Sequence, residues 1–250
     1  MFRWIRKLLL IFVVALLPFI APQVISYAST YGEATTHWSS ARYDRTYQSP
    51  DPKVEPEAVV QVLGARTWGW RGSFAIHTWI SVKPKGADEY KRYEVIGWRS
   101  PHLTIRNGVP DNYWAGNRPY VIQDIRGEQA EVIIDKLAPV VEAYPFKTEY
   151  TAWPGPNSNS FVAYLGRKIP ELRLDLPPTA IGKDYLVEDR LIGSAISGTG
   201  FQISAAGFGG LTLGTEEGIE FHLLGLTTGF DVNDLTLKLP GFGRVPLIPQ

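Results

Sequence analysis

A short polar stretch ahead of an apolar run is the first place in this chain where the residue types could support covalent chemistry. Residues 157–160 are Asn-Ser-Asn-Ser, and the apolar run after them predicts a short helix from about Asn157 to Gly166. The free N–H groups and partial positive charge of a helix N-terminus would stabilise an oxyanion beside a nucleophilic Ser158. The same residues are preferred helix caps after a Pro-Gly-Pro turn, so local sequence alone favours capping over catalysis.

Strands and a second helix are expected to position this stretch. Segments rich in β-branched and aromatic residues predict strands at 57–66, 73–83, 90–98 and 146–153, with a hairpin over 73–98 and a loop at 99–120. Apolar residues at helical spacing predict a helix over 127–144 that is kinked or broken near Pro139. From residue 198 onward, short apolar segments between glycines predict a β-rich extension.

The strand expected at 73–83 alternates between two sets of side chains. Ile76, Thr78 and Ile80 belong to one face, whereas His77 and Trp79 belong to the other. A lone strand histidine is most often satisfied by a backbone carbonyl, so His77 by itself predicts no chemistry.

Composition narrows the possible functions. The chain has no cysteine, which excludes disulfides, thiolate metal sites and a thiol nucleophile. The four histidines show no metal-site spacing, so we expect neither a metal nor another cofactor. Without the three basic residues of the first 30, the chain carries 22 basic and 25 acidic residues, a net charge of −3. This charge and the lack of basic runs argue against nucleic acid as a partner.

The first 30 residues predict a membrane-targeting segment. Arg3, Arg6 and Lys7 precede a run from Leu8 to Ile25 that contains no charge. Such a run fits a cleaved signal peptide, and it also just reaches the roughly 20 residues of a spanning helix. We favour a retained anchor. In either case the basic flank stays cytoplasmic, so the rest of the chain is expected to face the periplasm or the cell exterior.

These features predict four parts of the chain. Residues 1–28 are the anchor or signal peptide, and the polar residues 29–56 form a tether on which Trp38 could dock. Residues 57–180 form an α+β core, and residues 181–250 form a glycine-rich β extension packed on that core.

Four motifs carry a resemblance: "ARTWGWRGSFAIHTWI", "YWAGNRPY", "WPGPNSNSF" and "AIGKD". With them, the chain from about residue 57 to its end resembles a bacterial domain-of-unknown-function family, family 3750. The segment "NSNSFVAY" is also similar to the "NCEHFVTY" type of signature in the circularly permuted papain-like superfamily, which includes lecithin:retinol acyltransferase and amidase-like proteins. This second resemblance implies a permuted papain-like core in which an antiparallel sheet packs against helices.

The same resemblance implies a site in which Ser158 takes the place of the nucleophilic cysteine and His77 that of the base. Because a hydroxyl must pass its proton to a base during attack, His77 would have to contact Ser158 directly. Glu94 on the hairpin partner strand is our candidate for orienting the imidazole, with His102 as the fallback. The register decides this, since a slip of one residue would replace Glu94 by a neighbour.

Two functions from different classes follow. The first is an extracytoplasmic, membrane-tethered hydrolase or acyltransferase acting on an amide or ester bond, in a peptidoglycan peptide or a lipid ester. The second is an envelope binding or scaffold module without catalysis. In both, four residues are candidates to line a ligand cleft: Asn157, Trp79, Trp98 and Trp153.

Overall fold

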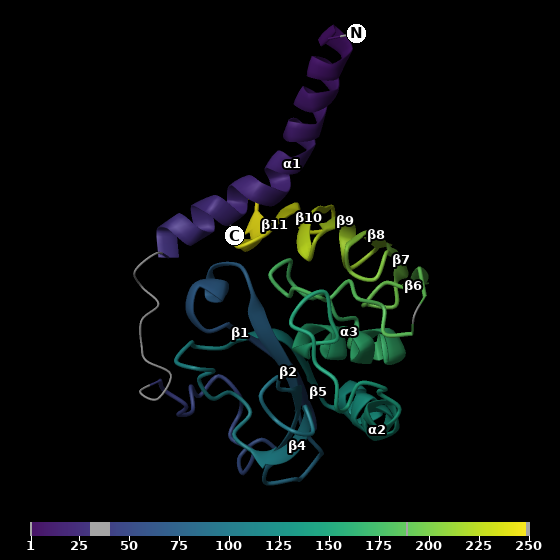
Figure 1. Ribbon diagram of the computed structural model, residues 1–250. Coiled ribbons are helices and arrows are strands. Elements are labelled where there is room, and N and C mark those ends of the chain that lie inside the picture. Colours follow the sequence, from purple (N-terminus) through teal and green to yellow (C-terminus); the bar gives the residue numbers. More distant parts are fainter. Residues whose placement is uncertain (1, 31–40, 189, 249–250) are drawn as a thin grey trace.

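The computed structural model describes residues 2–30, 41–188 and 190–248 (Figure 1). Within them the chain has an α+β architecture with two antiparallel sheets, as expected. The first sheet has the strand order β4-β3-β2-β1-β5. Its strands are β1 (Val59–Arg66), β2 (Ile76–Lys83), β3 (Tyr90–Val95), β4 (Leu103–Gly108) and β5 (Tyr120–Arg126).

The second sheet is formed by the C-terminal extension. Its seven strands run in sequence order from β6 to β12, each antiparallel to the next. They are β6 (Ile192–Ser194), β7 (Gly200–Ser204), β8 (Gly209–Gly214), β9 (Gly218–Leu223), β10 (Leu226–Asp231), β11 (Thr236–Leu239) and β12 (Gly243–Pro246). The predicted β-rich extension is therefore confirmed.

Two helices cover one face of the first sheet and build the main core. Helix α2 (Glu128–Glu142) packs on β1 and β5, and α3 (Ser158–Lys168) packs on β2 and β3. The strand residues Ile76, Ile80 and Val82 meet helix residues such as Phe161 in a core that excludes water. Figure 1 shows α3 lying between the first sheet and the strands of the second. Short 3-10 turns, η2 (Gly69–Ser73) and η3 (Pro170–Leu172), complete the connections.

Three expectations for this region need correction. The strand predicted over 146–153 is wrong, because these residues form turns and bends held against the first sheet; Leu103 N–H, for example, donates to Lys147 O over 3.0 Å. The segment 99–120 is not all loop, since β4 lies within it. Helix α2 is not broken at Pro139, because the proline lies in its last turn and its carbonyl accepts from Ala143 N–H.

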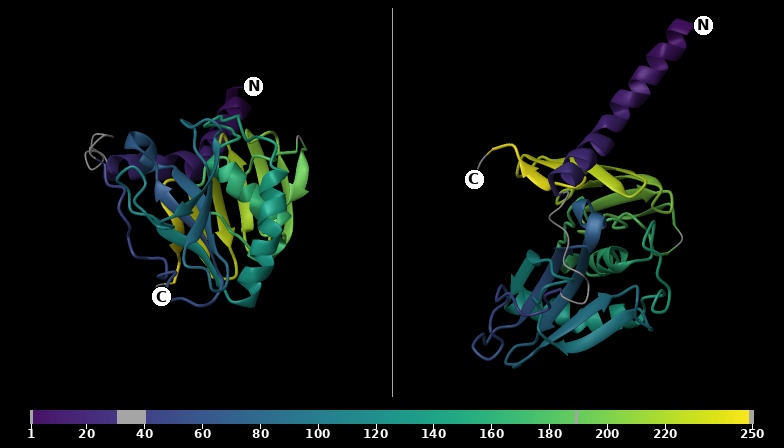
Figure 2. Two further views of the ribbon diagram at one scale, coloured as in Figure 1. Left: turned by 90° about the horizontal axis from the view of Figure 1, so that it is seen from below. Right: turned by 60° about the vertical axis from the view of Figure 1, so that its left-hand side comes forward.

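Helix α1 (Phe2–Thr30) has two differently placed halves. Its C-terminal half packs on η2, β10 and β11, and Ser26 Oγ donates to the carbonyl oxygens of Ser73 and Gly241. Pro18 and Pro22 interrupt its hydrogen bonding, and the N-terminal half stands away from the domain (Figure 2). Residues 4–29 are apolar and long enough to cross a membrane.

The predicted tether is only partly described. Trp38 lies outside the described residues. After that gap the chain packs on the first sheet's outer loops, where the buried Asp111 accepts hydrogen bonds from Thr46 Oγ1 and from Gln48 and Ser49 N–H.

Candidate functional site

The two side chains that the catalytic hypothesis pairs lie on opposite faces of β2. Thr78 points to the helix side, where its Oγ1 donates to Asn159 Oδ1 over 2.9 Å at the start of α3. Successive strand residues point to opposite faces, so His77 and Trp79 point away from α3. Both pack on the far side of the sheet, against Trp114.

His77 meets Glu94 on this far face. The β2–β3 pairing sets Ile80 opposite Tyr93, and continuing that register makes Glu94 the diagonal neighbour of His77. Their Nε2 and Oε2 atoms are 3.2 Å apart. The structure thus brings together the imidazole and the carboxylate that the sequence analysis paired.

Glu94 is also bound by two arginines. Arg92 and Arg106 each donate to one of its carboxylate oxygens over 2.7 Å. Burial would raise the Glu94 pKa, but the charges of Arg92 and Arg106 and the contact with His77 outweigh it and hold the pKa at about 2. Burial lowers the pKa of His77, against the opposite influence of Glu94. A neutral imidazole beside an ionised carboxylate donates its Nε2–H to it.

Aromatic rings enclose the same network. The His77 ring stacks on Trp114 with centroids 3.6 Å apart and planes 4° from parallel. The Arg92 guanidinium lies 4.0 Å from the centroid of Trp79, an arrangement that stabilises a cation away from water. Burial lowers the Arg92 pKa to about 10, and the side chain remains a cation at neutral pH.

The start of α3 is arranged as a helix cap. Asn157 Oδ1 accepts from the backbone N–H groups of Asn159 and Ser160, while Ser160 Oγ accepts from Asn157 N–H over 2.6 Å. This reciprocal pair is a capping box. Asn157 is therefore the cap, and Ser158 is the first helical residue, 4% exposed.

The structure does not bring Ser158 to His77. Among the described residues, the hydrogen-bond partner of the His77 ring is Glu94, and a sheet separates the imidazole from the start of α3. A serine nucleophile needs its base within about 2.6–3.2 Å, or somewhat more in an empty site. This arrangement does not supply that contact. The capping alternative matches the observed geometry, with Asn157 as the capping residue.

A cavity of about 380 Å³ opens beside the His77–Glu94 network. Arg92, Arg99 and Arg106 line it together with Trp98 and Trp114, and none of the lining residues within the described part of the chain is acidic. The other lining residues are Tyr43, Ile96, Asn107, Gly108, Val109, Asn112 and Ala115. Glu94 lies behind this wall and neutralises part of its positive charge.

The four residues predicted to bind a ligand are not gathered at one place. Trp98 is 62% exposed and lines the cavity. Trp79 is fully buried beneath it, where its Nε1–H donates to Pro110 O over 2.8 Å. Trp153 packs edge-on against Phe208 of the C-terminal extension, and Asn157 is the buried cap of α3. The fallback residue, His102, has its Nδ1 3.1 Å from Ile96 O.

Sequence reasoning missed the arginines and Trp114. Arg92 and Glu94 differ by two positions and so share a strand face with Ile96, a signal that was present in the alternation of 90–98. Arg106 lies on β4, the strand that was not predicted. No group of three or more metal-ligating side chains occurs among the described residues; His37 lies outside them.

A second buried polar cluster lies between α3 and the C-terminal sheet. Lys183 Nζ and Lys238 Nζ each donate to Glu220 Oε1 over 2.8 Å, and Lys238 also donates to Asp175. Burial would raise the Glu220 pKa, but the two lysines overcome this and hold it at about 2. Both His222 nitrogens contact threonine hydroxyls, and burial lowers its pKa to about 3. Lys183, Lys238, Glu220 and His222 are all hydrogen-bonded within the protein, which indicates a structural role.

Comparison with known proteins gives a family but no activity. No curated protein matches the chain, and no solved structure matches it either. One family model matches residues 57–185, more than half of the chain, and its description is "Protein of unknown function (DUF3750)". The match covers the first sheet, α2, α3 and every described lining residue of the arginine-lined cavity except Tyr43. The chain therefore belongs to the DUF3750 family of proteins of unknown function.

Proposed function

We propose that this protein is a membrane-anchored envelope module that binds an anionic, ring-bearing ligand in the cavity lined by Arg92, Arg99 and Arg106. The observation that carries the proposal is the lining itself, which combines three arginines and two tryptophans and, among the residues that the structure describes, has no acidic member. Guanidinium groups pair with carboxylates and phosphates through two parallel hydrogen bonds, and tryptophan faces stack on planar or sugar rings.

The network behind the cavity supports binding rather than turnover. Glu94 fixes Arg92 and Arg106 in place, and the stacked His77 and Trp114 form a rigid floor. A preformed site of this kind loses little side-chain entropy when a ligand binds. Muramyl carboxylates of peptidoglycan and phosphates of lipid headgroups share the anionic chemistry that the site would recognise.

Helix α1 completes the proposed function. If it is retained as an anchor, it holds the cavity within the length of one domain from the membrane, on the side opposite the basic N-terminus. A Ser158–His77 hydrolase is not favoured, because the two side chains lie on different faces of the first sheet.

The proposal is tested by titrating the full chain in detergent with muramyl dipeptide, which carries a carboxylate, and with inorganic phosphate. Tryptophan fluorescence reports binding, since Trp98 and Trp114 line the cavity. Arg99→Gln should weaken binding by about tenfold or more, the loss of one charge-assisted hydrogen bond. Arg173→Gln, an arginine change outside this cavity, is the matched control and should leave binding unchanged.

Two further outcomes decide the ligand. Muramyl dipeptide binding without phosphate binding indicates a glycan source, and the reverse indicates a phosphate source. Equal binding of neutral N-acetylglucosamine, or equal weakening by Arg99→Gln and Arg173→Gln, contradicts an anion site.

The tryptophan part of the proposal has its own pair of variants. Trp98→Ala should weaken the binding of a ring-bearing ligand. Trp70→Ala, which changes a similarly exposed tryptophan outside the cavity, should leave that binding unchanged.

A further inference from the structure

The second sheet has its polarity reversed relative to an ordinary sheet. Along β7 and β9 the side chains that point into the protein are polar, as for Gln202 and Glu220, and those that point outward are apolar, as for Phe201 and Phe221. A sheet that packs on a core normally turns its apolar face inward. The reversed pattern requires an explanation outside the domain.

The strand pairing aligns the outward side chains into two continuous rows. Both rows consist of apolar side chains and one threonine, without a charged residue. One row crosses six strands: Phe201, Leu213, Ile219, Phe230, Leu237 and Val245. The other crosses five: Ile192, Ile203, Leu211, Phe221 and Thr228.

These rows are open to the surroundings. Ile192 is 62% exposed and Phe221 is 52% exposed, and the remaining members are exposed or half-buried. Soluble proteins rarely leave a contiguous apolar patch of this extent in water. The inward face, by contrast, contains the Lys183–Glu220–Lys238 ion cluster, in which the buried charges pair with one another.

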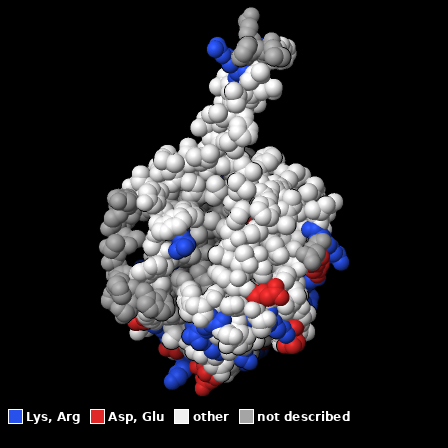
Figure 3. Space-filling view, viewed as in Figure 1, with Lys and Arg blue, Asp and Glu red and all other residues white. Residues whose placement is uncertain are grey.

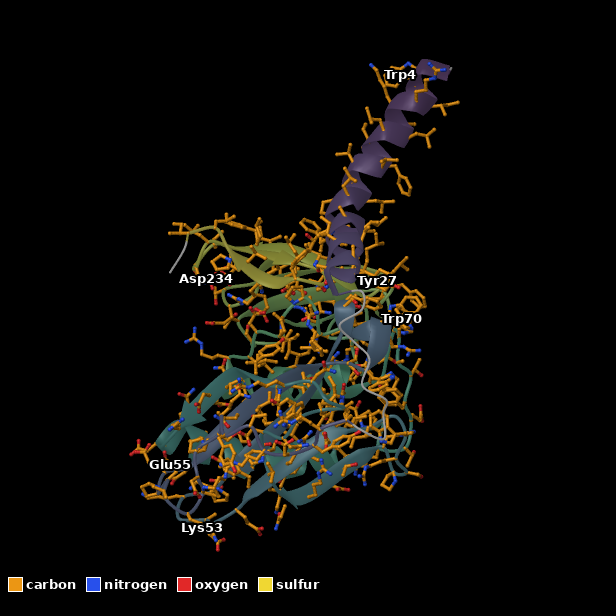
Figure 4. The ribbon with its side chains drawn as sticks, turned by 90° about the vertical axis from the view of Figure 1, so that its left-hand side faces the viewer. Trp4, Tyr27, Lys53, Glu55, Trp70 and Asp234 are labelled. Carbon is orange, nitrogen blue, oxygen red and sulfur yellow. The ribbon has the colours of Figure 1, made fainter. Side chains whose placement is uncertain are left out.

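The sheet lies on the side of the domain from which α1 projects. Helix α1 contacts β10 and β11, and Gly241, between β11 and β12, meets Ser26. Figure 4 shows the second sheet as the layer next to the helix, with Tyr27 and Trp70 beside the helix base and Lys53 and Glu55 at the opposite end of the domain. In Figure 3 the surface just below the helix is white, and most Lys, Arg, Asp and Glu side chains gather on the lower half.

We propose that the outward face of β6–β12 is a membrane-docking surface. It lies in the interfacial region of the same bilayer in which α1 anchors the protein. Continuity with an apolar helix and the absence of charge on both rows select lipid as the occupant. Apolar side chains enter the acyl boundary, and the inward ion cluster stays on the water side. Docking would fix the domain's orientation and its distance from the membrane, instead of leaving it on a loose tether.

The chain has no cysteine, so a single introduced cysteine can carry one spin label. The full-length protein is reconstituted into vesicles of phosphatidylcholine and phosphatidylglycerol. Labels are placed at Phe221 and Ile203 on one outward row, at Leu10 in α1, and at Lys53 as the matched water-side control. Frequent collisions of the spin label with oxygen indicate that it lies in lipid, and frequent collisions with a water-soluble nickel chelate indicate that it lies in water.

We expect the Phe221→Cys and Ile203→Cys labels to have an oxygen-to-nickel ratio several-fold above that of Lys53→Cys and closer to that of Leu10→Cys. Two positions are used so that one disturbed variant does not decide the result. Ratios at both positions equal to that at Lys53 would overturn the proposal, and Leu10 then shows whether the anchor failed as well. Spin–spin broadening that disappears on dilution with unlabelled protein would overturn it in favour of a second copy of the chain on this face.

Discussion

The two sheets of this protein bury opposite kinds of side chain. The first sheet turns apolar residues such as Ile80 and Val82 toward α2 and α3, in the manner of an ordinary α+β core. The second sheet turns Glu220, His222 and Lys238 toward the interior and keeps its phenylalanines and leucines outside. Helix α3 lies between them, and Arg167 near its end donates to Gln202 of the second sheet.

The contrast indicates which interactions hold each part together. Hydrophobic burial stabilises the first sheet against its helices, roughly in proportion to the apolar area removed from water. Ion pairs and hydrogen bonds between buried side chains hold the second sheet against the rest of the domain. Removing one of these charges therefore leaves other charges buried without a partner. The predictions below separate these two modes, beginning with the ion cluster.

Glu220→Gln should produce the largest loss of stability. It removes the carboxylate that Lys183 and Lys238 share, and all three side chains are 0–1% exposed. Leaving a buried cation without its partner costs about 3–5 kcal/mol. The free energy of unfolding in urea measures the effect, and Glu216→Gln is the matched control because its partner Arg173 is 61% exposed. Equal, small losses in both variants would show that the second sheet does not depend on its ion cluster.

Glu94→Gln tests the charged network on the first sheet through pH. The folded-state pKa of Glu94 is about 2, below its ordinary 4.5, so ionised Glu94 stabilises the fold by about 3 kcal/mol above pH 4.5. That contribution is lost as pH falls from about 4.5 toward 2. The difference in unfolding free energy between wild type and variant should therefore narrow with acidification. Thr104→Val, directly opposite Glu94 on β4, keeps every carboxylate and should differ from wild type by a constant amount.

The first sheet was largely predictable, because its strands follow rules of period two. The alternation over 73–83 correctly separated Ile76, Thr78 and Ile80 from His77 and Trp79. The structure adds that the Thr78 face meets α3, and alternation then places His77 on the face away from Ser158. The resemblance to a permuted papain-like signature directed attention to chain order, and order does not specify which face of a strand a side chain occupies.

The second sheet and the cavity were harder to predict for physical reasons. Alternation shows that two faces differ but does not say which face is inside, and the reversed polarity of β7–β11 follows only from tertiary packing. The cavity is assembled from loops, from Arg92 of β3 and from β4, whose sequence "LTIRNG" is too polar to stand out as a strand. Arg92 and Arg106 lie directly opposite each other in the β3–β4 pairing, and both bind Glu94, so their meeting could not be expected without β4.

Substitutions at the start of α3 should have the smallest effect on the free energy of unfolding. They test the helix that joins the two sheets. Asn157→Ala removes both the cap and the Nδ2–H bonds to Ala152 O and Ile181 O, so it should cost about 1–2 kcal/mol of unfolding free energy. Ser158→Ala should change the free energy of unfolding by no more than a few tenths of a kcal/mol, because Ser158 is not the cap and alanine is a good helix former.

The same pair of variants separates a cap from a nucleophile. Because Ser158 is buried at the start of α3 and His77 lies on the far face of β2, a fluorophosphonate probe should label wild type no more than Ser158→Ala. Labelling that disappears only in Ser158→Ala would mean that the first sheet opens to join the hydroxyl and a base. The static contrast between an apolar-cored sheet and a polar-cored one would then be incomplete, because α3 would have to move relative to β2. Unlabelled protein combined with a destabilised Asn157→Ala supports α3 as a fixed structural bridge between the two sheets.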